Sequence, residues 1–151
     1  MKDLTNSKID RQNILNNHFA LQEIETAIGF HGFNFDGKIC FTKKQVSDFY
    51  EVDERTIERQ LKDSKEELER NGYEILTGER LKQAKIAFGS DIDVGTKTTI
   101  FGMFDFRAFL NLAMLLTESK KAKEVRSIIL DIVIDTINKK AGGHTDPTPI
   151  N

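Results

Sequence analysis

The chain has 151 residues, of which 38% are hydrophobic and 30% charged, with a formal net charge of −2. This length fits one compact domain, and the apolar share is too high for a fully disordered chain. We find no apolar run that could span a membrane, no apolar signal segment at the N-terminus and one cysteine, Cys40. These features predict a protein of a reducing compartment, the cytoplasm, without a membrane partner or a disulfide framework.

The first predicted elements are a helix and a hairpin. Apolar residues recur at three- and four-residue spacing between Asp10 and Ile28, which predicts one helix that ends at Gly29. In the segment Phe33–Phe41, apolar residues alternate with polar ones on both sides of Asp36-Gly37. This pair supplies the positive φ that a tight turn needs, so we expect a small β-hairpin.

Two further helices are predicted over residues 42–50 and 53–70. Thr42 and Gln45 have the T-x-x-Q spacing of a capping box. Asp53 can cap the second helix, and Asn71-Gly72 ends it, because both residues tolerate the left-handed conformation. A short strand is predicted over residues 73–76.

Residues 79–104 contain one ambiguous segment and one strand. Residues 79–87 fit either a basic helix or a strand, and Gly89–Gly95 is predicted as a loop. Thr96–Phe104 is rich in β-branched and aromatic residues, which favours a strand.

Two apolar helices are predicted to complete the domain. Asp105 can cap a helix over residues 106–116, and the last helix runs from about Ser119 to Lys140. Apolar residues cover most of the last helix, so we expect it to be a core element or to pack against another protein. Residues 1–141 are thus expected to form a single domain, and residues 142–151 a flexible tail or linker.

The helices at 42–50 and 53–70 form a helix-turn-helix pattern. The pattern places an apolar residue in the turn, Val52, and another inside the second helix, Ile57. On a helical wheel, Ile57, Leu61, Ser64 and Leu68 share one side of the second helix. Its other side carries Arg55, Arg59 and Lys62. We therefore expect a buried face and a basic face, and a recognition helix that enters the DNA major groove through its N-terminal residues.

The residue types suit contacts with double-stranded DNA. Arginine can form paired hydrogen bonds with guanine, Gln60 could read adenine, and Lys43 and Lys44 begin the preceding helix, where phosphate contacts commonly arise. The predicted DNA-binding residues are Lys43, Lys44, Arg55, Thr56, Arg59, Gln60, Lys62, Lys120, Lys121 and Lys123. An ordinary solvated face is the alternative, because residues 43–70 hold seven Lys/Arg against nine Asp/Glu.

Two basic patches lie outside the helix-turn-helix. Lys120, Lys121 and Lys123, with Arg126, crowd the start of the last helix, where positive charge opposes the helix dipole and favours an anionic partner. An ordinary basic first turn is the alternative. Arg80, Lys82 and Lys85 form a second patch that could belong to a wing.

Two stretches of the chain resemble a known family of DNA-binding domains. The run FTKKQVSDFYEVDERTIERQLK, preceded by Gly37-Lys38, resembles the N-terminal DNA-binding region of the virulence-associated RhuM family. The later segment FGMFDFRAFLNLAMLLTESKKAKEVRSIILDIVIDTINKK is similar to the second half of that region, where a strand leads into a helix, a Ser-Lys-rich junction and a long helix. The layout, over residues 33–140, is also similar to the Bro-N and KilA-N domains of phage antirepressors.

The resemblance implies sequence-specific DNA binding. It also implies a module that precedes a Fic/Doc-like domain in bacterial relatives, with Gly142-Gly143 as the joint between the two. One position departs from the family pattern, since Glu51 stands where related helix-turn-helix sequences commonly have Gly at the turn.

Catalytic, metal and cofactor sites are not predicted. His18, His31 and His144 are far apart in the sequence and lack metal-ligand spacing. Cys40 lies in a predicted strand without a nearby histidine, so a buried thiol is favoured over a nucleophile.

The sequence as a whole predicts an α+β domain, mainly helical, with a helix-turn-helix that could be winged and with short β-hairpins. The expected function is sequence-specific DNA binding, as a transcriptional repressor or as the DNA-targeting module of a larger protein. A homodimer is expected, because one recognition helix reads only a few base pairs. The alternative is a protein-interaction module, antitoxin-like, that uses the apolar helices and never binds DNA.

Overall fold

The structure, a computed structural model, describes residues 3–88 and 100–140 as an α+β fold. The helices are η1 (Leu4–Asn6), α1 (Lys8–Leu15), α2 (His18–Ile28), α3 (Lys43–Tyr50), α4 (Glu54–Asp63), α5 (Lys65–Arg70), α6 (Gly78–Phe88), α7 (Phe106–Leu115) and α8 (Lys120–Lys140). The strands are β1 (Phe33–Phe35), β2 (Lys38–Thr42), β3 (Tyr73–Thr77) and β4 (Ile100–Asp105). They form an antiparallel sheet in the order β1-β2-β4-β3. The mainly helical α+β class with β-hairpins is therefore confirmed.

The predicted hairpin is present and has the expected turn. β1 pairs with β2, and Asp36 and Gly37 adopt φ values of 56° and 78°. Two successive residues with positive φ match the right-handed twist of the strands on either side, which is why an Asp-Gly pair is favoured there.

The prediction of one helix between Asp10 and Ile28 is wrong. The helical conformation is interrupted after α1, and Asn17 starts α2 by accepting a hydrogen bond from the backbone N–H of Ala20. Asparagine is among the best N-cap residues because its short side chain satisfies a free backbone donor. The predicted end at Gly29 is confirmed, with φ of 64°.

The prediction of one helix over residues 53–70 is also wrong. Ser64 adopts φ −125° and ψ 36°, which separates α4 from α5. Its hydroxyl accepts a hydrogen bond from the Gln60 side chain (2.8 Å). The change of direction allows α5 to bury Leu68 in the core.

The ambiguous segment after β3 is a helix, α6, which lies in the connection between β3 and β4. Arg80, Lys82 and Lys85 therefore belong to a helix and not to the strands of a wing. The loop predicted at residues 89–95, the first residues of the strand predicted at 96–104 and the tail predicted at 142–151 lie outside the described residues.

The two faces of the sheet bury different sets of side chains. Phe41 and Phe104 face the larger core, which α7 and α8 complete. The largest fully buried side chains of this core include Tyr50, Phe109, Ile14, Ile24, Ile57 and Leu68. The other face, under α6, holds a small core made of Phe35, Cys40, Leu76, Leu81, Ala84 and Met103.

The last helix is a core element along most of its length. Ala122, Val125, Ile129 and Val133 are buried, and α8 packs against α2 and α7. Among its described side chains, Ile134 remains 53% exposed. No helix in residues 3–88 and 100–140 combines the length and the apolar character needed to cross a membrane.

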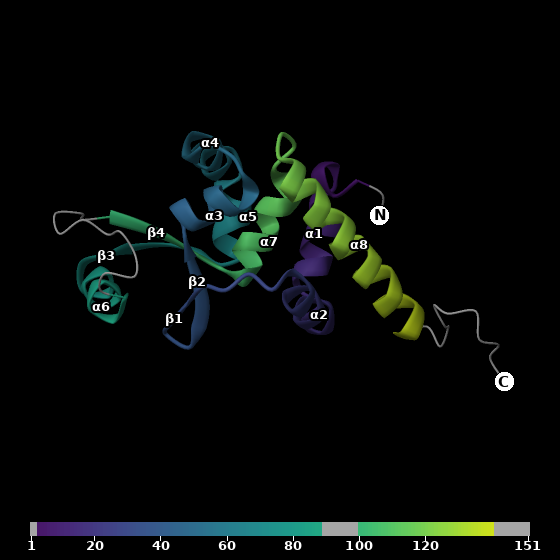
Figure 1. Ribbon diagram of the computed structural model, residues 1–151, viewed down its shortest axis with the longest axis horizontal. Helices are drawn as coiled ribbons and strands as arrows, with labels where there is room; N and C mark the ends of the chain where they lie inside the picture. Colours follow the sequence, from purple (N-terminus) through teal and green to yellow (C-terminus); the bar gives the residue numbers. More distant parts are fainter. Residues whose placement is uncertain (1–2, 89–99, 141–151) are drawn as a thin grey trace.

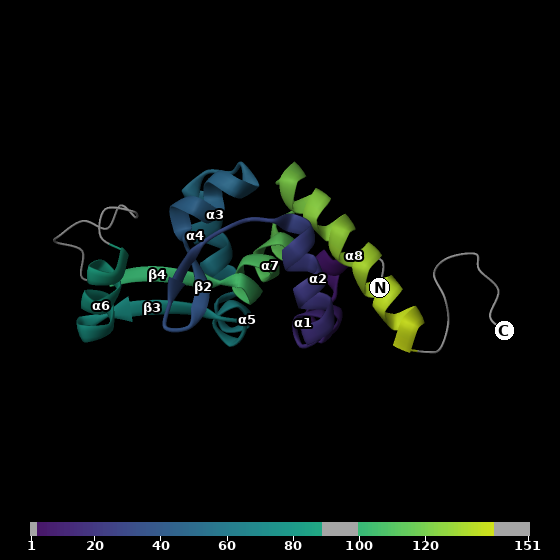
Figure 2. The same cartoon turned by 60° about the horizontal axis from the view of Figure 1, so that its bottom comes forward.

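The molecule is elongated. α6 and the distal ends of β3 and β4 lie at one end, and the C-terminal end of α8 lies at the other (Figure 1). α3 and α4 project from the middle, on the same side as the first turn of α8, and both views agree on this (Figure 2). The helix pair and the start of α8 therefore form one continuous side of the molecule.

Candidate nucleic-acid interface

The predicted helix-turn-helix is present as α3, a three-residue turn and α4. Thr42 and Gln45 form the expected capping box, with hydrogen bonds of 2.9 and 3.1 Å. Asp53 caps α4 by accepting a hydrogen bond from the backbone N–H of Arg55 (2.9 Å). The sequence therefore specifies the start of both helices locally.

The turn between the helices depends on an unusual backbone conformation. Glu51 adopts φ 57° and ψ 44°, the left-handed region in which Gly is the favoured residue. The backbone N–H of Val52 then bonds to the carbonyl of Ser47 (3.0 Å), and the Val52 side chain packs against the larger core. Glu51 thus takes the conformation that Gly commonly supplies, although its own side chain disfavours it.

α3 is attached to the two C-terminal helices by buried hydrogen bonds. The Tyr50 hydroxyl donates to the carbonyl of Phe109 in α7 (2.6 Å). The Ser119 hydroxyl donates to the carbonyl of Tyr50 (2.6 Å) and accepts from the backbone N–H of Ala122, which caps α8. One serine therefore both starts α8 and places its first turn beside the helix-turn-helix.

α4 has the buried and basic sides that its helical wheel predicts. Ile57 is fully buried and Leu61 is half-buried, whereas Arg55, Arg59 and Lys62 are exposed. This arrangement leaves the basic side free to approach a partner while the apolar side holds α4 on the core.

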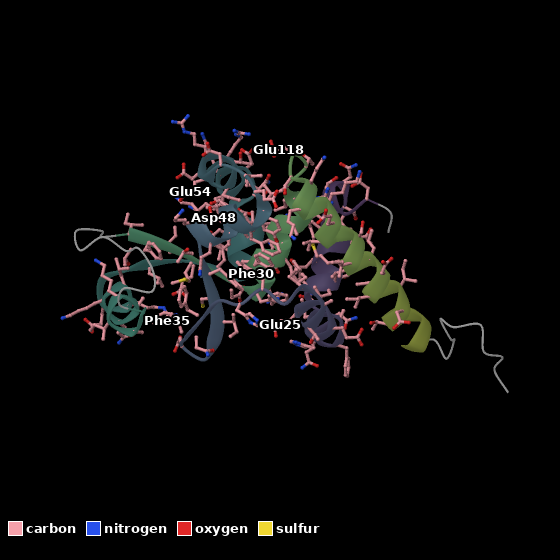
Figure 3. The ribbon with its side chains drawn as sticks, in the orientation of Figure 1. Glu25, Phe30, Phe35, Asp48, Glu54 and Glu118 are labelled. Atoms are coloured by element: carbon pink, nitrogen blue, oxygen red, sulfur yellow. The ribbon has the colours of Figure 1, made fainter. Side chains whose placement is uncertain are left out.

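Three of the predicted basic residues are paired with carboxylates. The Lys43 ammonium lies 2.7 Å from Glu58, and the Lys44 ammonium lies 3.5 Å from Asp48. Arg59 Nη1 lies 3.6 Å from a carboxylate oxygen of Glu118, in the turn between α7 and α8. Figure 3 shows Glu118 near α4, on the side of the molecule that also carries Asp48 and Glu54.

Arg55 and Lys62 have no ion pair within residues 3–88 and 100–140. Thr56 is half-buried on α4, and the Gln60 amide donates to Ser64. Gln60 would have to break that hydrogen bond, or use its carbonyl oxygen, to contact a base. Arg55, the basic residue in the first turn of α4, is therefore available to a ligand.

The lysines at the start of α8 join this surface. Lys121 places its ammonium 5.1 Å from the centre of the Phe49 ring of α3. Lys120 and Lys123 are exposed. Arg126, counted with them in the sequence, instead donates to the carbonyls of Ala113 and Leu116 (2.7 and 2.8 Å), so it serves to cap α7.

The second basic patch lies elsewhere and is partly neutralised. Arg80 pairs with Glu74 and Asp36 and stacks over Phe35. α6, which carries Arg80, lies at the end of the molecule away from the start of α8 (Figure 1). The structure therefore does not bring this patch together with the lysines of α8.

A buried polar network behind the helix-turn-helix has no signal in the sequence. Two nitrogens of Arg11 lie 2.7 and 2.8 Å from the two carboxylate oxygens of Glu67, and Asn111 donates to the same carboxylate (2.6 Å). Burial disfavours the charged carboxylate, but the hydrogen bonds from Arg11 and Asn111 outweigh it and lower the pKa of Glu67. The network joins α1, α5 and α7, and it removes one acidic residue from the solvent-exposed surface.

Cys40 is buried, as expected for a structural thiol. Burial and the neighbouring Asp105 raise its pKa to about 11, so the thiolate is disfavoured near neutral pH. Within the described ranges 3–88 and 100–140, no three His, Cys, Asp or Glu residues gather in a way that could hold a metal ion.

Comparisons of the chain with known protein families, with curated proteins and with solved structures found no match.

Proposed function

We propose that this chain is a sequence-specific domain for double-stranded DNA and that α4 is its recognition helix. The observation that carries the proposal is the division of α4 into a buried side, at Ile57, and an exposed basic side, at Arg55, Arg59 and Lys62. This division occurs directly after a three-residue turn. In DNA-binding helix-turn-helix domains, the second helix enters the major groove with its N-terminal residues against the bases.

Other residues of the same side fit phosphate contacts. Lys43 and Lys44 begin α3, and Lys120 and Lys121 begin α8, so lysines flank α4 on two elements. Flanking contacts of this kind hold a recognition helix in register on the duplex without reading its sequence. The resemblance to RhuM, Bro-N and KilA-N domains points to the same function, as a repressor or as the targeting module of a larger protein.

The test is selection of a binding site from a pool of random duplexes. We expect the wild-type chain to enrich one sequence, and Arg55→Ala and Arg59→Ala each to weaken binding to it by about 1–3 kcal/mol. Both side chains are exposed, so the melting temperature should not change. Lys8→Ala, on α1, removes the same charge from a helix far from α4 and serves as the matched control (Figure 2).

Salt dependence separates this proposal from the alternative. Phosphate contacts make affinity fall steeply as ionic strength rises. If the pool yields no enriched duplex, and Arg55→Ala and Arg59→Ala bind every duplex as the wild type does, the DNA-binding proposal is wrong. The protein-interaction module would then be the better description.

A further inference from the structure

The backbone of the turn that carries Glu118 is held in a fixed place beside α4. This turn, between α7 and α8, is anchored on both sides, because Leu116 and Ser119 are buried. Arg126 holds the carbonyl of Leu116 (2.8 Å), and the Ser119 hydroxyl holds the carbonyl of Tyr50 (2.6 Å). Glu118 projects from this anchored turn toward α4 (Figure 3).

Glu118 contacts a residue that is proposed to read DNA. Its carboxylate lies 3.6 Å from Arg59 Nη1, and the Glu118 and Arg59 side chains are 52% and 62% exposed. A guanidinium has five N–H donors in a planar fork. The ion pair through Nη1 therefore leaves enough donors for a paired contact with guanine.

The same carboxylate opposes binding to phosphates. A negative charge beside the DNA-binding side repels the backbone, which every duplex presents whatever its sequence. It also competes with phosphate for Arg59. The ion pair with Glu118 strengthens a contact between Arg59 and guanine, because an arginine already held in place loses less side-chain freedom when it binds.

From these contacts, we propose that Glu118 determines specificity: it positions Arg59 for base reading and competes with the phosphates that Arg59 would otherwise bind in DNA of any other sequence. The proposal rests on the DNA-binding function proposed above. In this role the negative charge of Glu118 contributes to specific recognition. Specific recognition is a difference between two affinities, and lowering the unwanted one widens that difference.

The experiment compares two duplexes of equal length, the site selected by the wild-type chain and a scrambled version of it. For Glu118→Gln, we expect about two- to fivefold tighter binding to the scrambled duplex, the range for losing one exposed ion pair. Binding to the selected site should stay unchanged or weaken. The salt dependence on the scrambled duplex should steepen by about 0.9 in the log–log slope, because Arg59 can then neutralise one more phosphate.

Two comparisons test whether the effect is local. Glu23→Gln, an exposed position on α2, makes the same change of net charge and should leave the ratio of the two affinities unchanged. In an Arg59→Ala background, Glu118→Gln should no longer lower affinity for the selected site relative to the scrambled duplex. This double-mutant cycle isolates the coupling between the two side chains.

The outcomes also separate this inference from the function on which it rests. If the wild-type chain prefers the selected site and Glu118→Gln strengthens both duplexes equally, or neither, the specificity role is wrong while DNA binding stands. An equal effect of Glu23→Gln would also overturn it. If the wild-type chain shows no preference between the duplexes, the DNA-binding proposal itself fails.

Discussion

Glu51 is the residue whose backbone defines the angle between α3 and α4. A left-handed backbone places Cβ close to the following carbonyl, which costs an ordinary L-residue about 1–2 kcal/mol. The Glu51 side chain is exposed, so its burial does not offset this cost. The turn is held by the bond from Val52 to Ser47 and by burial of Tyr50, which lie on either side of Glu51.

We therefore expect Glu51→Gly to stabilise the domain. Gly removes the steric cost at φ 57° but loses more chain entropy on folding, so the net gain should be about 0.5–1 kcal/mol. Urea unfolding measures it. Glu51→Ala removes the same charge and keeps the strain, so equal stability of the Gly and Ala variants would contradict the strain argument.

At the residue scale, the sequence predicts features whose partners are close along the chain. Thr42 and Gln45 cap one helix, Asp36-Gly37 makes one turn, and the two sides of α4 follow from spacing alone. Pairs such as Arg59 with Glu118 have no such signal, because the fold brings distant segments together. For the same reason the sequence could not distinguish Arg126, which caps α7, from the lysines beside it.

Among the elements, α1 and α5 are joined to α7 by one buried carboxylate. Glu67 accepts hydrogen bonds from Arg11 and Asn111, and Asn111 also accepts one from Asn71 (3.0 Å), just after α5. Removing one partner of such a buried pair leaves an uncompensated charge, whose cost is about 3–5 kcal/mol. Because α5 follows α4 directly, this network also helps to hold α4 in place.

The lowered pKa of Glu67 predicts a pH-dependent contribution to stability. Its folded-state value lies below the ordinary 4.5, so the contribution is fully present above about pH 4.5 and is lost as the pH falls through the folded-state value. Glu67→Gln should lower the free energy of unfolding by about 3–5 kcal/mol at pH 7, and this difference from wild type should shrink below pH 4.5.

Denaturant unfolding at a series of pH values measures this difference. Glu66→Gln, at the exposed neighbouring position in the first turn of the same helix, should stay within about 1 kcal/mol of wild type throughout. The raised pKa of Asp105, caused by burial, acts equally in all three proteins and cancels in the comparison. A difference that stayed constant from pH 7 to pH 3 would show that the Glu67 charge does not contribute.

At the scale of elements, periodicity identifies most helices but misses two breaks. Apolar spacing continues across Asn16-Asn17 and across Ser64, so each predicted helix is in fact a pair. The breaks lie at Asn17 and Ser64, whose side chains accept hydrogen bonds from nearby groups. Such local bonds offer the chain an alternative to a continuous helix, but both residue types are also tolerated inside helices, so their presence alone does not predict a break. The tertiary core, by burying Leu15 and Leu68, decides between the two conformations.

At the scale of the whole molecule, the exposed apolar residues of α2 and α8 bear on whether the chain forms a homodimer. α2 covers much of α8, as a monomer would require, yet Ile134 of α8 and Phe19 of α2 remain exposed. Symmetric dimers allow helix-turn-helix domains to read two half-sites, because one recognition helix contacts few base pairs. We propose that Ile134 belongs to a contact between two copies of the chain.

Light scattering at micromolar concentration tests the dimer. We expect twice the mass of one chain, and a palindromic sequence in the selected DNA site. Ile134→Asp should return the mass to that of one chain and leave the helical circular dichroism unchanged, because the side chain is 53% exposed within one chain. A wild-type mass of one chain, with a binding site that lacks symmetry, would contradict the dimer.

The small core under α6 has a consequence for how the molecule opens. It shares no buried residue with the larger core, since the two lie on opposite faces of the sheet. Loosening α6 exposes its own Leu81 and Ala84 and the four side chains of this core that belong to the strands, and the free energy of such a local opening is smaller than that of global unfolding. The backbone amides of α6 should therefore exchange with solvent through partial openings in which α4, α7 and α8 keep their native packing.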